Sequence, residues 1–368
     1  MPSRPPRSRT NLYGLGRPGL RRFFEEAGAA PYHADQAFRW LYRLDRLDPS
    51  AWTDLPLALR SRILDGARVE EGSIDDRAEA ADGTVKCRIA LAEGDAVETV
   101  LLVQSGRATL CLSTQVGCAL GCRFCLTGRM GFLRNLGPGE IVGQVALAKR
   151  ERALGDGPFN VVLMGMGEPL RNYDAVIEAF RLLTDPEGFG LSHRRITLST
   201  AGLAPEIERL AREPRRPRLA VSLNATTDGI RDRLMPINRR FPIARLREAC
   251  RVFARETGDG FTFEYVLLAG VNDSDADIAR LARIARAHPA KLNLIPFNPV
   301  PGQLDFRPTA RERTIEIRDR LAAMDVRVAI RWSRGTEARA ACGQLAVERG
   351  PSSPRAGRGS APAHGRRP

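Results

Sequence analysis

Short apolar segments alternate with amphipathic stretches from residue 108 onward, and this alternation constrains the fold more than any other feature of the chain. The stretches between the segments, such as PGEIVGQVALAKR and YDAVIEAFRLL, place apolar residues at helical spacing. Strands that alternate with helices of this length predict βα units and a parallel sheet. Six such units favour an α/β protein with a partial (β/α)6 TIM-like barrel over a closed eight-fold barrel. The six segments are residues 108–114, 160–166, 195–200, 219–224, 261–268 and 291–297, and a further candidate strand spans 326–332.

The region before the barrel divides into a helical part and a β-hairpin. Within residues 23–68, apolar residues such as Phe38 and Leu41 recur at helical spacing. Alternating residues in VKCRIAL and AVETVLLV flank the turn EGD and predict the two strands of a hairpin. On the second strand Glu98 shares a face with apolar residues. An edge-strand glutamate that reaches solvent is the simplest interpretation.

Both ends of the chain are basic. The formal net charge is +14, and residues 1–22 and 349–368 contain many arginines and no acids. Their Pro/Gly-rich composition predicts disorder, and their charge suits a polyanion such as RNA. An arginine bias of the whole sequence explains the charge equally well, because lysines are rare throughout. We therefore expect four parts, namely a basic disordered arm (1–22), a small N-terminal helical domain with the hairpin (23–103), the barrel (104–345) and a disordered tail (346–368).

Length, hydropathy and cysteine content narrow the class of protein. No apolar run approaches the ~20 residues that a bilayer span needs. The N-terminus has positive charge but lacks the apolar region of a secretory signal. We therefore expect a cytoplasmic monomer that does not contact membranes. The chain has 7 cysteines, and an odd number does not fit a disulfide framework.

Three of these cysteines stand together in GCALGCRFC. Cys118, Cys122 and Cys125 form a C-x3-C-x2-C triplet after the first barrel strand. Iron–sulfur clusters are held by cysteine thiolates, commonly four, so three ligands leave one iron open to another molecule. Structural zinc is the alternative, but its four ligands usually come in pairs, and the sequence has no second pair. Cys111 or His193 could supply a fourth zinc ligand.

Polar and glycine residues follow several of the other strands. Ligands of βα folds gather at the carboxyl ends of the strands, so these residues and the cysteine loop are expected to meet in one site. They are Gly167, Glu168, Ser199, Ser222, Asn224 and Asn298. Two isolated cysteines have simpler interpretations, Cys111 as a small buried strand residue and Cys342 as part of a tightly packed segment.

These motifs occur in the order that is typical of one known family. The cysteine loop, with Phe124 before its last cysteine, is similar to the radical S-adenosylmethionine (SAM) superfamily. Within it the chain resembles the RlmN/Cfr group of RNA adenosine methyltransferases from about Phe38 to Leu345. The resemblance rests on FRWLYRLD, LPLALRSRI, ATLCLSTQVGCALGCRFCLTG, GFLRNL, VVLMGMGEPL, ITLSTAG, MPIN, NLIPFNP and RAACGQL.

The resemblance implies two cofactor sites. The three cysteines of the loop would hold a 4Fe–4S cluster whose open iron binds the amino and carboxylate groups of SAM. The residues that would line the SAM pocket are Gly167, Glu168, Ser199, Ser222, Leu223, Asn224 and Asn298. Asn224 stands where many members have histidine, and Glu337 and Arg339 depart from a common form of the segment before Cys342.

The resemblance also implies a reaction. Cys342 would accept a methyl group from one SAM, and a radical from a second SAM would take a hydrogen atom from that methyl group. The carbon radical would add to an adenine ring carbon, C2 in the first instance. Proton removal, with Glu98 as acceptor, and a transient disulfide between Cys111 and Cys342 would release the product. A thiolate is needed because the ring carbon is not nucleophilic and cannot attack SAM directly.

The implied substrate is an adenosine in 23S rRNA, with tRNA as a second substrate, and the implied electron donor is a protein such as flavodoxin or ferredoxin. Methylation at C8 or of another RNA is the first alternative. A metal-binding RNA-binding module without catalysis is a more distant alternative, and it would need neither Cys111 nor Cys342.

Overall fold

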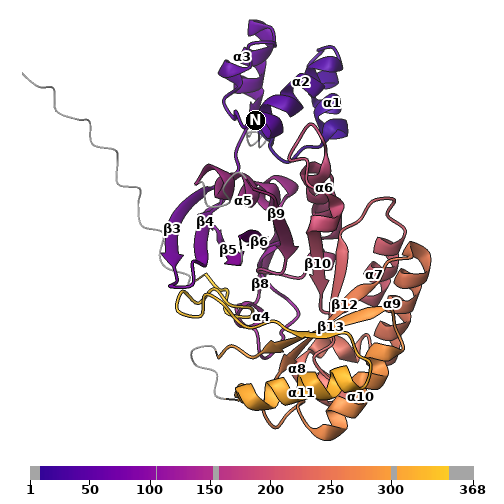
Figure 1. Cartoon of the computed structure of the whole chain (residues 1–368). Coiled ribbons are helices and arrows are strands. Elements are labelled where there is room, and N and C mark those ends of the chain that lie inside the picture. Colours follow the sequence, from indigo (N-terminus) through magenta and orange to yellow (C-terminus); the bar gives the residue numbers. More distant parts are fainter. Residues whose placement is uncertain (1–8, 105, 152–156, 300–304, 348–368) are drawn as a thin grey trace, which may run out of the picture.

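A ten-stranded sheet organises the protein (Figure 1). The computed structural model describes residues 9–104, 106–151, 157–299 and 305–347. Seven neighbouring strands are parallel and follow the order β14-β13-β12-β11-β10-β9-β6. Their bounds are β6 (Arg107–Cys111), β9 (Phe159–Leu163), β10 (Ile196–Thr200), β11 (Arg218–Ser222), β12 (Phe261–Leu267), β13 (Ala290–Pro296) and β14 (Val328–Ile330).

Helices connect successive parallel strands and cover the outside of the sheet (Figure 1). Their apolar faces are buried, as at Val176 and Phe180 of α6 or Leu246 and Phe253 of α9. The helices are α5 (Pro138–Arg150), α6 (Tyr173–Thr184), α7 (Ala204–Ala211), α8 (Asp228–Leu234), α9 (Ile243–Thr257), α10 (Asp275–Arg286) and α11 (Arg311–Ala323), with short 3₁₀ turns at Pro169–Asn172, His193–Arg195 and Pro236–Arg239. The curved sheet does not close, because β3 and β14 remain as edges. The predicted partial barrel is confirmed.

The β-hairpin belongs to the barrel sheet. Strands β3 (Ser73–Glu79), β4 (Val85–Ala90) and β5 (Ala96–Gln104) continue the sheet in antiparallel pairing, and β5 pairs with β6. The expected boundary between residues 103 and 104 therefore falls inside one sheet. The edge-strand interpretation of Glu98 is also wrong, because β5 lies between β4 and β6. Strand β3 escapes the sequence pattern because its seven residues, SIDDRAE, are almost all polar.

A small helical domain precedes the sheet and begins earlier than expected. It contains α1 (Arg17–Glu26), α2 (Tyr32–Phe38), a π-helical turn (Arg39–Arg43), a 3₁₀ turn (Pro49–Ala51) and α3 (Leu57–Gly66), with β1 (Thr10–Asn11) paired to β2 (Ala67–Arg68). The prediction of a disordered arm is therefore wrong for residues 10–22. Leu12 and Leu20 are fully buried, and Arg17 forms ion pairs with Asp35 (2.6 Å) and Asp185 (3.0 Å). Residues 1–8 of the predicted arm and residues 348–368 of the predicted tail lie outside the described residues.

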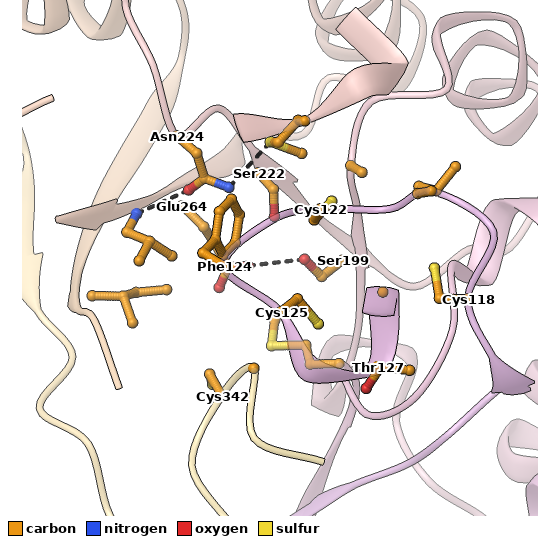
Figure 2. Close-up of a pocket in the computed structure, with 18 of the residues that line it drawn as sticks. Cys118, Cys122, Phe124, Cys125, Thr127, Ser199, Ser222, Asn224, Glu264 and Cys342 are labelled. Atoms are coloured by element: carbon orange, nitrogen blue, oxygen red, sulfur yellow. Dashed lines mark hydrogen bonds between the residues drawn. The ribbon is translucent and has the colours of Figure 1, made fainter. Parts of the chain in front are cut away.

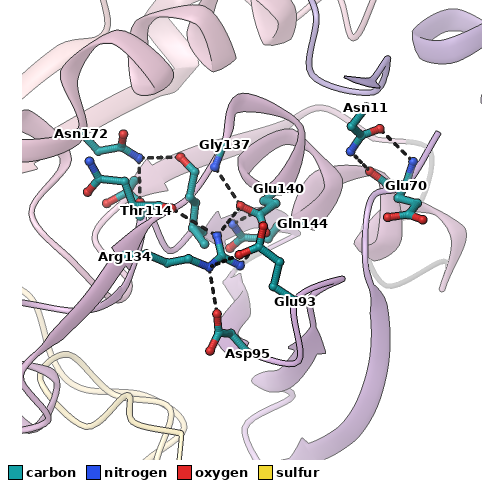
Figure 3. Close-up of polar contacts among 12 residues, drawn as sticks. Asn11, Glu70, Glu93, Asp95, Thr114, Arg134, Gly137, Glu140, Gln144 and Asn172 are labelled. Carbon is teal, nitrogen blue, oxygen red and sulfur yellow. Dashed lines mark hydrogen bonds and ion pairs between the residues drawn. The ribbon is translucent and has the colours of Figure 1, made fainter. Parts of the chain in front are cut away.

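Arg134 ties the base of the cysteine loop to its surroundings (Figure 3). The loop lies between β7 (Gln115–Gly117) and β8 (Phe132–Asn135), which pair with each other. From β8, Arg134 reaches Asp95 in the β4–β5 turn (2.8 Å) and Glu140 in the first turn of α5 (2.8 Å). Glu140 in turn accepts a hydrogen bond from the Gly137 amide (2.8 Å). The loop therefore starts and ends at points that are fixed to both the hairpin and the first barrel helix.

In the part of the chain that the structure describes, every helix is too short or too polar to cross a membrane.

Candidate active site

A cavity of about 170 Å³ lies at the carboxyl ends of the parallel strands (Figure 2). Residues from the cysteine loop, from the ends of β9 to β13 and from the segment around Cys342 line it. Its wall contains nearly all of the expected cofactor-binding residues. These are Cys118, Cys122, Cys125, Gly167, Glu168, Ser199, Ser222, Asn224 and Asn298, together with Cys342. Residues up to 224 positions apart in the sequence thus meet at the place where βα folds bind ligands.

Hydrogen bonds join the cysteine loop directly to the Cys342 segment. Helix α4 (Leu126–Arg129) begins immediately after Cys125, and the Leu126 amide donates to the Gly343 carbonyl (2.8 Å). The Thr127 hydroxyl donates to the Leu345 carbonyl (2.6 Å), and the Asn298 amide nitrogen donates to the Cys342 carbonyl (3.2 Å). The two segments therefore form one wall of the cavity.

The three thiols of the loop suit a cluster. Burial raises the pKa of Cys118 to about 12 and raises the pKa values of Cys122 and Cys125 as well. A metal binds the thiolate form, so a cluster that binds these buried thiols displaces their protons. A cluster spreads its cysteine ligands over separate iron atoms. All three thiols line the same cavity, so they can serve as such ligands.

Glu168 is the most strongly held acid of the cavity. One carboxylate oxygen accepts from the Leu170 amide (3.1 Å) and the other from the Ala201 amide (2.7 Å). Burial nevertheless raises the pKa of Glu168 to about 7, and the two amides oppose that rise. The carboxylate is thus fixed in place, and a bound cation such as an ammonium group would favour its ionised form.

Asn224 bridges two strand ends. Its backbone has a φ of 54°, a left-handed conformation that asparagine tolerates better than most residues. The side-chain oxygen accepts from the Val266 amide of β12 (2.9 Å), and its nitrogen contacts the Met235 sulfur (3.3 Å). The amide therefore spans the wall of the cavity.

Leu223 is the exception among the expected pocket residues. It is fully buried and does not line the cavity, because its amide and carbonyl are engaged with Glu264 and Arg231. Arg231 itself is fully buried, and its guanidinium donates to three carbonyls, those of Leu223 (2.9 Å), Ala201 (2.7 Å) and Ser222 (3.0 Å). It fixes the ends of β10 and β11. Burial lowers the pKa of Arg231 to about 10.

A second, smaller cavity joins Cys342 to Cys111. It measures about 120 Å³, and both cysteines line it. Cys342 lines both this cavity and the larger one, so it stands between Cys111 and the cysteine loop. Burial raises the pKa of Cys111 to about 12, whereas Cys342 is exposed and the nearby Arg331 guanidinium acts to lower the pKa of its thiol. All seven cysteines are free thiols.

Glu98 lies beneath the Cys342 segment and lines neither of these two cavities. It is 5% exposed, pairs with Lys86 (2.8 Å) and accepts from the Ala346 amide (2.9 Å). Burial raises its pKa, and Lys86 opposes the rise. Glu98 therefore anchors the segment four residues beyond Cys342.

Two charged residues of the site belong to no motif. Glu264 accepts from the Ser199 hydroxyl (2.8 Å) and lies 3.5 Å from the Arg331 guanidinium, which also contacts the Met164 sulfur (3.3 Å). The signal in the sequence was a single acid inside the apolar strand FTFEYVLL, since a charge there must face an interior partner. Arg331 gave no comparable signal, because it follows a strand in an arginine-rich segment.

Two family models match the chain. Residues 112–282 match the radical SAM superfamily, and residues 10–69 match the ribosomal RNA large subunit methyltransferase N-terminal domain. The dual-specificity RNA methyltransferase RlmN of Anaeromyxobacter dehalogenans is 47% identical over 351 residues, which are 94% of each chain. The chain belongs to the RlmN family.

Other relatives agree with that assignment. The RlmN enzyme of Pelobacter propionicus is 44% identical over 92% of this chain and 96% of its own. The crystal structure of a radical SAM methyltransferase from Sphaerobacter thermophilus superposes with a TM-score of 0.86 at 44% identity, covering 91% of this chain and 99% of the other. As an RlmN family member, the chain is a SAM-dependent radical RNA methyltransferase.

Proposed function

We propose that this enzyme methylates C2 of an adenosine in 23S rRNA, and in tRNA, by way of a methyl group carried on Cys342. The observation that carries the proposal is the position of Cys342, which lines both the cavity of the cysteine loop and the cavity that contains Cys111. A methyl group on its sulfur can face SAM on one side and the substrate on the other. The RlmN relatives, named as dual-specificity enzymes, support two RNA substrates.

Cys342 supplies the nucleophile that adenine lacks. Its thiolate attacks the methyl group of a first SAM, and the proton of the thiol leaves before that attack. Arg331 favours the thiolate, since its nearby guanidinium acts to lower the pKa of the exposed Cys342 thiol. Glu168, Ser199, Ser222 and Asn298 would orient SAM from the strand ends, with Gly167 and Asn224 completing the wall. Leu223 is left out of this set because its backbone is occupied by Glu264 and Arg231.

Cys118, Cys122 and Cys125 would hold the 4Fe–4S cluster. Held by these three thiolates, such a cluster would supply the one-electron reduction that divides a second SAM into methionine and a 5′-deoxyadenosyl radical. An electron-transfer protein such as flavodoxin or ferredoxin would deliver that electron to the enzyme, which we take to act as a cytoplasmic monomer.

Glu98 and Cys111 complete the reaction in the proposal. Cys111 shares a cavity with Cys342, so its thiol can form the transient disulfide that frees the product. Glu98 is the proton acceptor, and its raised pKa suits that task. The Ala346 amide and Lys86 now occupy its oxygens, so the Cys342 segment must shift before Glu98 meets the substrate.

Anaerobic reconstitution tests the proposal. The purified chain is loaded with iron and sulfide, supplied with SAM and dithionite, and incubated with unmodified 23S rRNA or tRNA transcripts. Mass spectrometry of the digested RNA should then find 2-methyladenosine at one position. 8-Methyladenosine would move the reaction to C8, the carbon of the five-membered ring. A protein that binds RNA but neither cleaves SAM nor methylates any RNA would overturn the proposal in favour of a binding module.

A further inference from the structure

A third cavity, of about 950 Å³, opens at the amino-terminal ends of the barrel strands, opposite the SAM side. Residues at or just before the starts of β9, β10, β11, β12, β13 and β14 line it. It is several times larger than the SAM cavity. It lies far from the loop that holds the three cysteines, and that loop contributes nothing to its wall.

The wall of this cavity is strongly basic. Arg194, Arg195, Arg218, Lys291 and Arg327 line it, and within the described residues none of the five has an ion-pair or side-chain hydrogen-bond partner. Many other arginines among the described residues do have carboxylate partners, as Arg209 and Arg245 do. Even in this cavity, Arg216 is paired with Asp259 (3.2 Å). In the described part of the chain these five cations gather at one opening without carboxylate partners, and their mutual repulsion favours the binding of an anionic ligand there.

The cavity borders the one that contains the reacting cysteines. It shares Gln104, Thr109, Met164 and Arg331 with the cavity that contains Cys111 and Cys342. It also shares Met164 and Glu264 with the SAM cavity. The Arg331 guanidinium stands at this border, where it contacts the Met164 sulfur (3.3 Å) and Glu264 (3.5 Å). A group that enters between the five cations would therefore pass Arg331 to reach Cys342 from the side opposite to SAM.

We propose that the five cations bind RNA phosphates beside the target adenosine, and that the adenine enters the barrel through this amino-terminal opening. The inference rests on the proposed function, since it assumes an RNA substrate. An enzyme that modifies a base must take that base out of its stack, while the flanking phosphates remain outside. Cations at the rim hold those phosphates, and the cavity of about 950 Å³ has room for the base.

An acidic electron-transfer protein is the competing occupant of a basic surface. The position of the cavity disfavours it. An electron must reach the cysteine loop, which lines the opposite end of the barrel, whereas this opening borders the cavity of Cys111 and Cys342. A nucleobase is also narrow enough to pass between strand ends, which a folded protein is not.

Charge removal at the rim is the first test. Arg218→Ala combined with Arg327→Ala removes two unpaired cations, and the matched control Arg251→Ala combined with Arg283→Ala removes two exposed arginines from the outer helices α9 and α10 (Figure 1). Fluorescence anisotropy measures binding of a labelled 23S rRNA stem–loop from low to high salt. The slope of log K against log salt should fall by about 1.4 in the rim variant, and its affinity at ~0.1 M salt should fall at least tenfold. The control should keep the wild-type slope, and thermal melting checks that both variants fold.

A plug in the opening is the second test. Thr197 lies in β10 and lines the basic cavity, so Thr197→Trp should block entry of the base and abolish methylation, whereas Thr197→Ser should retain it. Wild-type methylation at full rate in the Thr197→Trp protein would overturn the inference. Equal salt slopes for the rim variant and the wild type would overturn it as well. So would a rim variant that binds RNA normally and fails only with a protein reductant, because the opening would then dock that reductant.

The two proposals can fail separately. If the wild-type enzyme methylates RNA but the rim and plug variants behave like it, the entry route is wrong and the methyltransferase proposal stands. If no RNA is methylated although RNA binding depends on the rim cations, the proposed reaction is wrong and the binding site stands.

Discussion

The two ends of the barrel differ in how their charged side chains are partnered. At the carboxyl end the cavity measures about 170 Å³, and its charged groups are held: both Glu168 oxygens accept backbone hydrogen bonds, and buried Arg231 satisfies three carbonyls. At the amino end the cavity measures about 950 Å³, and exposed cations such as Arg218 and Arg327 have no partner in the described chain. A small cofactor of fixed shape suits a rigid, satisfied site. A polymer that must enter and leave suits an open, charged one.

The largest expected effect comes from Cys342, where the two ends meet. Cys342→Ala should abolish RNA methylation, because no sulfur remains to carry the methyl group, while SAM cleavage continues. Mass spectrometry of RNA nucleosides and chromatography of 5′-deoxyadenosine measure the two outcomes. Cys87→Ala, in the hairpin strand β4, is the matched control and should methylate normally. Normal methylation by the Cys342→Ala protein would show that Cys342 does not connect the two ends of the barrel.

Substitution of Arg231 tests whether buried hydrogen bonds hold the carboxyl end of the barrel together. Arg231→Met leaves three carbonyls without their donor, so the free energy of unfolding should fall by about 3 kcal/mol or more. Arg233→Met, an exposed change two residues away on the same helix α8, should cost far less. Urea denaturation compares the two. Equal losses would mean that the carboxyl end is no more tightly held than the surface.

Much of this end could be predicted from the sequence. The barrel strands are long apolar runs, and the residues after each run meet because parallel strands end at one edge. Arg231 could not be found in this way, because TTDGIRDRL reads as a solvated polar helix until the helix folds back over the strand ends. The prediction for residues 10–22 was wrong for a related reason. Their arginines suggested a disordered arm, and the two buried leucines, Leu12 and Leu20, are too far apart to form a recognisable pattern.

The amino end was harder to predict. Its cations stand singly before separate strands, and only the curvature of the sheet brings them together. The sequence placed the excess positive charge at the chain ends, where it is visible as runs. The structure shows a second concentration of positive charge at the amino-terminal opening, and its residues are not consecutive in the sequence.

The pH dependence of stability sharpens the description of Glu168. Its pKa rises from 4.5 to about 7 on folding, so its contribution to stability is complete below pH 4.5 and is lost as the pH rises through 7. Over that interval the unfolding free energy of the cluster-free protein should fall relative to Glu168→Gln by up to about 3 kcal/mol. Glu248→Gln, on the exposed side of α9, controls for the loss of one carboxylate. A constant difference between Glu168→Gln and wild type across this range would show that the carboxylate is not buried as described.

The smallest expected effect is at the rim. Arg218→Ala should change the unfolding free energy by no more than about 0.5 kcal/mol, because an exposed cation without a partner contributes little to folding. Thermal denaturation with Arg231→Met as the reference makes the contrast explicit. A loss comparable to that of Arg231→Met would mean that Arg218 has a structural partner, and the two ends would no longer differ in kind.

The central claim is that Cys342 carries the methyl group between the two ends of the barrel. Peptide mass spectrometry of the reconstituted enzyme, incubated with SAM and reductant in the absence of RNA, tests it directly. The account predicts one added methyl group on the peptide that contains Cys342, and loss of that group to RNA when substrate is supplied. A methyl group on another cysteine, or RNA methylation with Cys342 never modified, would contradict it.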